Sequence, residues 1–144
     1  MLSILLALAT ATATAPLSIE VDNVRNAKGI VHVDICPKDR FLGESCPYSG
    51  DAPARPGTVI VVVNNVPAGD YAAQAFHDEN RNHDIDQGLF GIPKEGVGFS
   101  RNARILFSPP KWTDAVFTHS GRPEMIRLAL RYWTGAKGPP TARR

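Results

Sequence analysis

The sequence predicts an all-β fold, and within that class an antiparallel β-sandwich of about seven strands. Three observations favour it. Several stretches alternate apolar with polar residues, which is the pattern of strands with one buried face. Turn-forming residues separate these stretches, and helix signals are almost absent. The chain of 144 residues suits one domain, which we expect over residues 16–134, followed by a disordered tail over residues 135–144.

The first 15 residues have the features of a signal peptide, with cleavage expected near Ala13. Leu2 to Leu8 is nearly all apolar, about the length of a signal-peptide core and far too short to cross a bilayer. Small residues follow with Ala-x-Ala spacing. The alternative, an apolar first strand, suits this segment less well because alanine is depleted in strands. We therefore expect an exported protein, periplasmic or secreted, without a transmembrane segment in the mature chain.

Five stretches are expected to form strands: residues 17–21, 31–35, 58–66, 70–77 and 126–133. The third, TVIVVVNNV, is β-branched almost throughout, which favours a central strand buried on both faces. The last alternates apolar residues with Arg127 and Arg131, and it predicts a half-exposed strand with a basic outer row. A short helical turn capped by Thr113 is expected within residues 109–117.

Turns are predicted where glycine and proline fall between the strands. Residues 26–29, NAKG, fit a hairpin turn between the first two strands, with Gly29 at a positive φ. Residues 66–71, VPAGDY, fit a tight turn into the next strand. Residues 37–57 are expected to form a long loop, and a loop of this length is uncommon unless it is functional or cross-linked.

Cys36 and Cys46 are the only cysteines, and we expect them to form a disulfide. Two cysteines in an exported protein usually pair, and closing a loop of about ten residues contributes roughly 2.7 kcal/mol in the chain-entropy model. Two free thiols are the alternative. Two cysteines alone are too few for a closed thiolate metal site.

The net charge excludes nucleic acid as an expected partner. It is +2, whereas nucleic-acid-binding domains present strongly basic, clustered surfaces. The expected partner is instead a protein, a glycan or a small ligand.

Residues 77–86, HDENRNHDID, form the densest run of hydrogen-bonding side chains in the chain. Oxygen-bearing residues stand at every second position, and we predict them as metal ligands for Ca²⁺: Asp78, Asn80, Asn82, Asp84 and Asp86. Their spacing follows positions 1, 3, 5, 7 and 9 of a calcium loop. The pattern is broken twice, because His83 replaces the turn glycine and Leu89 replaces the closing glutamate. Glu79 or Glu95 could close the site from outside the loop.

Other interpretations of this loop stay open. Asp and Asn tolerate left-handed backbone and bond their own main chain, so a metal-free turn also explains the run. A transition-metal site would recruit His77 and His83 with a carboxylate. The enzymatic alternative is a hydrolase that uses His77, Asp78 and Glu95.

Two adjacent motifs resemble the DUF2141 family of small exported bacterial proteins. They read VPAGDYAAQAFHDENRNHDID and LFGIPKEGVGFSRNA, and the resemblance extends over about residues 17–133. It implies an Ig-like or transthyretin-like β-sandwich, with residues 76–100 as the signature region. The family loop usually has glycine where this chain has His83, and the insertion around Cys36 and Cys46 is longer than usual. The family's function is unassigned, so the resemblance implies no reaction.

We therefore expect an exported β-sandwich module that acts by binding or as a structural element rather than as an enzyme, with a candidate Ca²⁺ loop at residues 78–86. A family motif that lies in a loop indicates function more strongly than a motif that lies in the hydrophobic core. The alternatives are the hydrolase and a purely structural envelope protein. His32 and His119 are distant in sequence, and we interpret them as surface or hydrogen-bonded side chains.

Overall fold

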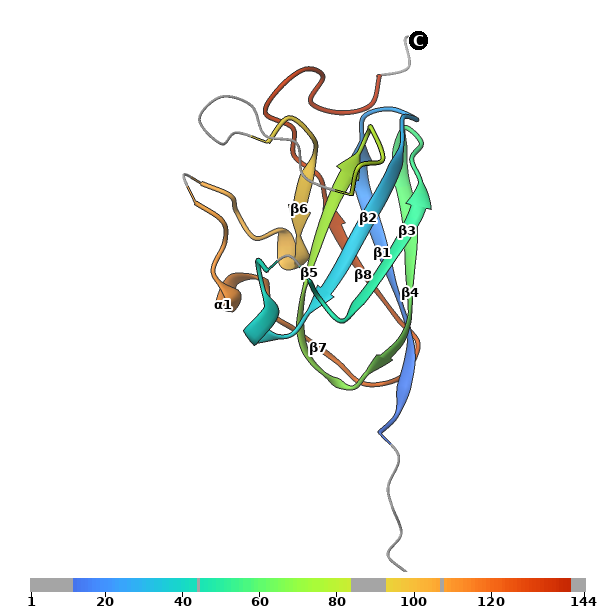
Figure 1. The fold of residues 1–144 in the computed structure, drawn as a ribbon, viewed down its shortest axis with the longest axis vertical. Helices are drawn as coiled ribbons and strands as arrows, with labels where there is room; N and C mark the ends of the chain where they lie inside the picture. The colour runs from blue at the N-terminus through green and yellow to red at the C-terminus, as the bar shows by residue number, and fades with distance from the viewer. Residues whose placement is uncertain (1–11, 44, 84–92, 107, 141–144) are drawn as a thin grey trace, which may run out of the picture.

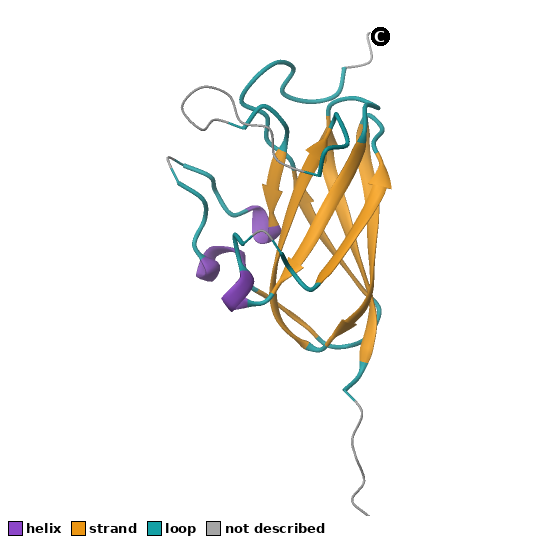
Figure 2. Ribbon diagram, in the orientation of Figure 1, coloured by secondary structure: helices purple, strands orange, loops and turns teal. Residues whose placement is uncertain are grey.

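The computed structural model describes residues 12–43, 45–83, 93–106 and 108–140. Two facing sheets make up the fold (Figure 1, Figure 2). In chain order the described strands are β1 (Thr14–Val24), β2 (Ile30–Cys36), β3 (Tyr48–Pro53), β4 (Gly57–Pro67), β5 (Gly69–Asp78), β6 (Val97–Phe99), β7 (Phe117–His119) and β8 (Glu124–Ala129). Short helical segments accompany them: η1 (Lys38–Arg40), η3 (Ser100–Asn102) and α1 (Trp112–Ala115). The predicted all-β sandwich is confirmed. Within the described residues, no helix is long and apolar enough to cross a membrane.

The smaller sheet has the strand order β4-β1-β8. β1 runs antiparallel to β4, with Ile19 opposite Val61, and parallel to β8, with Ile19 opposite Ile126. The parallel pair departs from the expected antiparallel arrangement. Parallel neighbours need a long crossover connection, and here the whole chain between β1 and β8 provides it. No local pattern in the sequence therefore indicates this pairing.

The larger sheet has the order β3-β2-β5-β6, and β7 pairs with the beginning of β5. All of these pairs are antiparallel. His32 on β2 lies opposite Asp51 on β3, while its neighbour Val31 lies opposite His77 on β5. Because successive side chains of a strand point to opposite faces, His32 and His77 lie on opposite faces of one sheet.

The predicted hairpin over residues 26–29 is wrong, because β1 and β2 belong to different sheets. The chain does reverse there, but it crosses from the smaller sheet to the larger one. Gly29 has the expected positive φ, 68°, and a Cβ at this position would meet the backbone oxygen of Asp78 at 1.9 Å. The tight turn between β4 and β5 also passes from one sheet to the other. Turn residues indicate a reversal, but they do not select the sheet that the next strand joins.

β4 is an edge strand with one buried face, so the prediction of a central strand buried on both faces is wrong. Val61 is fully buried, whereas Ile60 and Val62 are 50% and 46% exposed. A continuous apolar run is compatible with either position. The exposed fractions show that the outer face of the smaller sheet is open to solvent at β4.

The predicted disulfide between Cys36 and Cys46 is present, with the two Cα atoms 5.0 Å apart. It joins the end of β2 to the segment just before β3. The predicted long loop over residues 37–57 is interrupted, because its second half contains β3. The short helical turn is confirmed as α1, but Lys111 and not Thr113 occupies its N-cap position.

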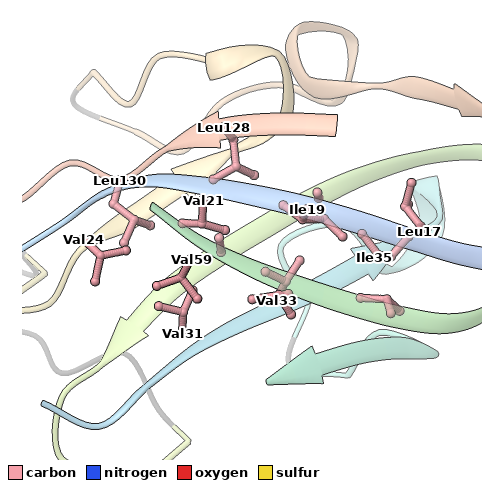
Figure 3. Close-up of a cluster of buried hydrophobic side chains, with 14 of the residues drawn as sticks. Leu17, Ile19, Val21, Val24, Val31, Val33, Ile35, Val59, Leu128 and Leu130 are labelled. Atoms are coloured by element: carbon pink, nitrogen blue, oxygen red, sulfur yellow. The ribbon is translucent and has the colours of Figure 1, made fainter. Parts of the chain in front are cut away.

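The main hydrophobic core fills the space between the two sheets (Figure 3). Its fully buried side chains come from alternating positions of the strands and include Leu17, Ile19, Val33, Ile35, Leu128 and Leu130. A smaller apolar cluster lies on the other face of the larger sheet, where Phe99 and Trp112 pack around the Phe41 ring beside Phe76. β5 is thus packed on both faces, which fixes the position of its C-terminal end.

Candidate functional site

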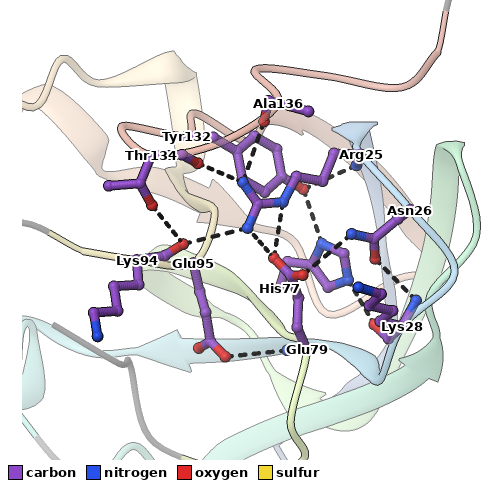
Figure 4. A network of polar contacts seen from close by, with 10 residues as sticks. All are labelled: Arg25, Asn26, Lys28, His77, Glu79, Lys94, Glu95, Tyr132, Thr134 and Ala136. Atoms are coloured by element: carbon purple, nitrogen blue, oxygen red, sulfur yellow. Dashed lines mark hydrogen bonds and ion pairs between the residues drawn. The ribbon is translucent and has the colours of Figure 1, made fainter. Parts of the chain in front are cut away.

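A network of polar side chains lies where β5 ends (Figure 4). Its centre consists of Arg25, His77, Glu79 and Tyr132, which we call the polar hub. These residues come from three separate parts of the chain: the β1–β2 connection, the end of β5, and the segment after β8. The polar hub therefore fastens the loop after β5 and the C-terminal segment to the sandwich.

His77 is fully buried, and both of its ring nitrogens have partners. Nε2 lies 2.7 Å from the carbonyl oxygen of Lys28, and because a carbonyl only accepts, Nε2 carries the proton. Nδ1 then accepts the Tyr132 hydroxyl at 2.9 Å, and this hydroxyl accepts the Arg25 backbone N–H at 3.0 Å. Burial lowers the pKa of His77 below its ordinary value and raises the pKa of Tyr132 to about 12. Both groups are therefore neutral near pH 7.

Arg25 and Glu79 form the charged part of the hub. The guanidinium donates through Nε to Glu79 Oε1 at 2.8 Å and through Nη2 to the same oxygen, while Asn26 donates to Oε2 at 3.1 Å. Burial acts to raise the pKa of Glu79, but hydrogen bonds from Asn26 and Arg25 hold this pKa below its ordinary value. Arg25 also donates to the carbonyl oxygens of Thr134 and Ala136. One side chain thus joins the loop after β5 to the C-terminal segment.

Asp78, the first residue of the predicted calcium loop, is fully buried and organises the turn that follows it. Its Oδ1 accepts the backbone N–H of Asn82 at 3.1 Å, and its Oδ2 accepts the backbone N–H of His83 at 2.8 Å. Asn80 Oδ1 accepts the same Asn82 N–H at 3.2 Å, so oxygens of Asp78 and Asn80 converge. His83 has a φ of 61°, a left-handed conformation that glycine adopts most easily and that calcium loops usually provide with glycine.

Glu95 lies against the beginning of this turn. It is only 4% exposed, and its Oε1 accepts the backbone N–H of Glu79 at 3.1 Å. The carbonyl oxygen of the preceding residue, Lys94, accepts the Thr134 hydroxyl at 3.2 Å. The segment at residues 94–95 is thus attached to the polar hub, and it brings a second carboxylate next to the Asp78 turn.

A second polar group lies on the outer face of the larger sheet, and we call it the outer-face cluster: His32, Asp34, Asp51 and His83. His32 Nε2 lies 2.9 Å from Asp34 Oδ1, and His32 Nδ1 is hydrogen-bonded to Asp51 Oδ1. The His83 ring lies edge-on to the His32 ring, with centroids 6.5 Å apart. Burial acts to lower the pKa of His32, but the two carboxylates raise it to about 9. One nitrogen or oxygen atom from each of His32, Asp51 and His83 lies within 4.8 Å of the other two.

A family model described as "Uncharacterized protein conserved in bacteria (DUF2141)" matches residues 19–127. The chain belongs to the DUF2141 family. The matched residues run from β1 into β8 and include the turn after β5, so the resemblance inferred from the two motifs is confirmed. No curated protein and no solved structure matches the chain.

The structure brings together part of the calcium-ligand set predicted for this DUF2141 protein. Asp78, Asn80 and Asn82 lie in one turn. Asp84 and Asp86 lie outside the described residues, and calcium binding therefore stays a prediction. Glu79, one of the two residues considered for closing the loop, is held by the polar hub instead.

The hydrolase constellation of His77, Asp78 and Glu95 does not assemble in a cleft. A general base must reach the proton that it removes, but His77 is fully buried and bonded at both nitrogens. Asp78 follows His77 in β5 and so points to the opposite face of the sheet, where both of its oxygens hold the turn. The transition-metal set that paired His77 with His83 is also wrong, because both ring nitrogens of His77 are already bonded. His83 lies beside His32 instead.

Sequence analysis missed Arg25, Tyr132 and His32 as members of polar groups. Arg25 and Tyr132 are 107 positions apart, and no local pattern links them. The interpretation of His32 and His119 as surface or hydrogen-bonded side chains is confirmed. His32 is bonded to Asp34 and Asp51, and Glu124 and the carbonyl oxygen of Val66 are the partners of His119. For His32 a signal did exist, since the alternation of β2 places His32 and Asp34 on one polar face. The pairing of β2 with β3 was not predicted, because β3 lies within the segment predicted as a loop.

Proposed function

We propose that this DUF2141 protein is an exported, non-enzymatic β-sandwich module that acts by binding, with the end of β5 and the loop at residues 78–86 as its binding surface. The observation that carries the proposal is the burial of His77. The side chain that acid–base chemistry would need is enclosed, neutral and bonded through both ring nitrogens. This supports a polar end that maintains a shape and offers a surface to a protein, a glycan or a small ligand.

The cation proposed for this loop is Ca²⁺. Hard cations prefer oxygen ligands, and oxygens of Asp78 and Asn80 converge in the described half of the loop. His83 adopts a left-handed φ, so the curl of the loop does not depend on a glycine. Glu95 lies beside the turn, which supports it as the closing carboxylate. The remaining proposed ligands are Asn82, Asp84 and Asp86.

Calorimetry with Ca²⁺ on the protein purified after export tests the calcium proposal. We expect a binding heat and a melting temperature that rises with calcium, because a ligand that binds only the folded state stabilises it. Asp86→Asn should weaken both effects. Asp39→Asn, a change at an exposed aspartate in η1, is the matched control and should change neither. No heat and no melting shift at millimolar Ca²⁺ would exclude calcium from the proposed function.

Chemical modification of histidines tests the non-enzymatic part. Diethyl pyrocarbonate should leave His77 unmodified in the folded protein and react with it after unfolding in urea, as judged by mass spectrometry of peptides. His83 is exposed and serves as the reactive control within the same molecule. Modification of His77 in the folded state would show that solvent reaches the ring, and it would restore the hydrolase alternative.

A purely structural role is the second candidate, and the contacts of Asp78 favour it. Both of its carboxylate oxygens already accept backbone N–H groups of the turn. In that case Asp78→Ala lowers the free energy of unfolding, while Ca²⁺ has no effect on the wild-type protein or on Asp86→Asn.

A further inference from the structure

The outer-face cluster places two imidazoles and two carboxylates on a well-supported surface. His32 and Asp34 lie two positions apart on β2, and Asp51 is the register partner of His32 on β3. The Phe76 ring from β5 packs against His32, with ring centroids 5.0 Å apart. The strand positions of three of the four side chains are thus fixed by the larger sheet.

His83 reaches this surface from the loop after β5. Its backbone N–H donates to the buried Asp78 carboxylate at 2.8 Å, and its φ is 61°. These two features turn the loop back over the sheet, so that the exposed His83 ring lies beside His32. A histidine at this turn therefore adds a nitrogen ligand that a glycine could not provide.

The orientation of the His32 ring resembles that of a metal ligand. Metal-binding histidines usually donate their second ring N–H to a carboxylate, which fixes the tautomer and the ring plane. His32 Nε2 lies 2.9 Å from Asp34 Oδ1, which is suited to this supporting role. His32 Nδ1 is then directed at Asp51.

We propose that His32, Asp51 and His83 bind a borderline transition-metal ion such as Zn²⁺, with Asp34 as the supporting carboxylate. Two imidazole nitrogens and one carboxylate oxygen form a donor set that Zn²⁺ uses, with water in the fourth position. With bonds of about 2.0–2.1 Å, tetrahedral ligand atoms lie about 3.4 Å apart. The candidate atoms lie within 4.8 Å of one another, so changes of about 1.4 Å at most in their spacing bring them to this geometry. Rotation of the exposed His83 side chain can provide this movement.

This site differs from the proposed calcium loop in ligands and in chemistry. Imidazole nitrogens suit zinc, copper and nickel, whereas Ca²⁺ takes oxygen ligands. The side chain at the position of His83 is not a ligand in a calcium loop. The two proposals can therefore fail independently.

Imidazole NMR resonances during a Zn²⁺ titration test the site directly. The protein is purified after export without a histidine tag, treated with EDTA and dialysed. Resonances of His32 and His83 should change together and saturate at one equivalent of Zn²⁺. The buried His77 and His119 are internal controls whose resonances should stay in place. A change at His83 alone, or no saturation at one equivalent, overturns the proposal.

Substitutions at the exposed ligands give the quantitative test. His83→Ala and Asp51→Asn should each weaken Zn²⁺ binding in calorimetry by about 10-fold to 100-fold or more, and Asp34→Asn by about 10-fold. Asp39→Asn should bind as the wild type does. Urea unfolding of each metal-free variant confirms that it is folded. If Zn²⁺ affinity is unchanged in both His83→Ala and Asp51→Asn, the site is not the one proposed.

His83→Gly separates the two metals. Glycine suits the left-handed backbone at this position, so the variant should keep any Ca²⁺ binding of the wild type while losing Zn²⁺ binding. Asp86→Asn should do the reverse and keep Zn²⁺ binding. Retention of full Zn²⁺ affinity in His83→Gly contradicts a role for this imidazole.

Discussion

His77 in the polar hub and His32 in the outer-face cluster lie on adjacent strands of one sheet, and their surroundings are opposite. His77 points inward, where burial keeps it neutral and its ring nitrogens are bonded to a carbonyl oxygen and a hydroxyl. His32 points outward between two carboxylates, which favour its charged form. The pKa of His77 is therefore lowered, whereas the pKa of His32 is raised to about 9.

This difference shows that the partners of a histidine, and not its position near a loop, decide its protonation state and its ability to bind a metal ion. In the polar hub both ring nitrogens of His77 form hydrogen bonds that join separate segments of the chain. In the outer-face cluster the partners are carboxylates and a second imidazole, which are groups that a metal ion can share. The hub contributes to stability, and the cluster is the proposed Zn²⁺ site. The predictions below probe this contrast, beginning with the largest expected effect.

His77→Ala should lower the free energy of unfolding by about 2–4 kcal/mol, because it leaves a cavity and removes the partner of the Lys28 carbonyl and the Tyr132 hydroxyl. Urea unfolding followed by circular dichroism measures the change. The matched variant His32→Ala should cost about 1 kcal/mol. Equal losses in the two variants would remove the contrast between hub and cluster.

Tyr132→Phe should cost about 1–3 kcal/mol, since it leaves His77 Nδ1 and the Arg25 backbone N–H without a partner in a buried site. The ring itself stays, so packing changes little. A loss well below this range would mean that water replaces the hydroxyl and that the hub is less enclosed than we infer. Chemical denaturation at pH 7 provides the measurement.

The pH dependence of stability should have opposite signs at the two histidines in metal-free protein. The contribution of His77, whose folded-state pKa is lowered, is present above pH 6.5 and is lost as the pH falls below it. The contribution of His32 is present below pH 6.5 and is lost as the pH rises through about 9. We expect on the order of 1 kcal/mol for His32, because its partner Asp51 is 45% exposed and screened by solvent. NMR titration should give a midpoint near 9 for His32, and a midpoint below 6.5 would contradict the pairing with both carboxylates.

Asp51→Asn should have the smallest effect, about 0.5 kcal/mol on the stability of the metal-free protein, since exposed ion pairs contribute little. The same variant should have a large effect on Zn²⁺ affinity. A side chain that matters little for folding and much for metal binding is what the contrast predicts for the outer-face cluster. Unfolding curves recorded with EDTA and with Zn²⁺ separate the two effects.

The sequence was informative wherever a signal was local. Alternation of apolar residues located β1, β2, β5 and β8, because each of these strands has one buried face, and a continuous β-branched run located β4. The cysteine count, together with the expected export, was enough to predict the Cys36–Cys46 disulfide. β6 and β7 have only three residues each, which is too short for a period to be recognised, and β3 lies within a stretch rich in turn residues.

The sequence by itself determined the class of the fold, the disulfide, the turn after β5 and the family. Only the tertiary structure decided which sheet each strand joined and which side chains meet. The β1–β8 pair, the hydrogen bond between Arg25 and Tyr132, and the approach of His83 to His32 all depend on contacts between distant parts of the chain. Such contacts follow from burying one common core, and a core forms from the combined pattern of all strands and not from any single segment. The sequence therefore drew attention to His77, and the structure showed that His32 is the histidine with partners a metal ion could use.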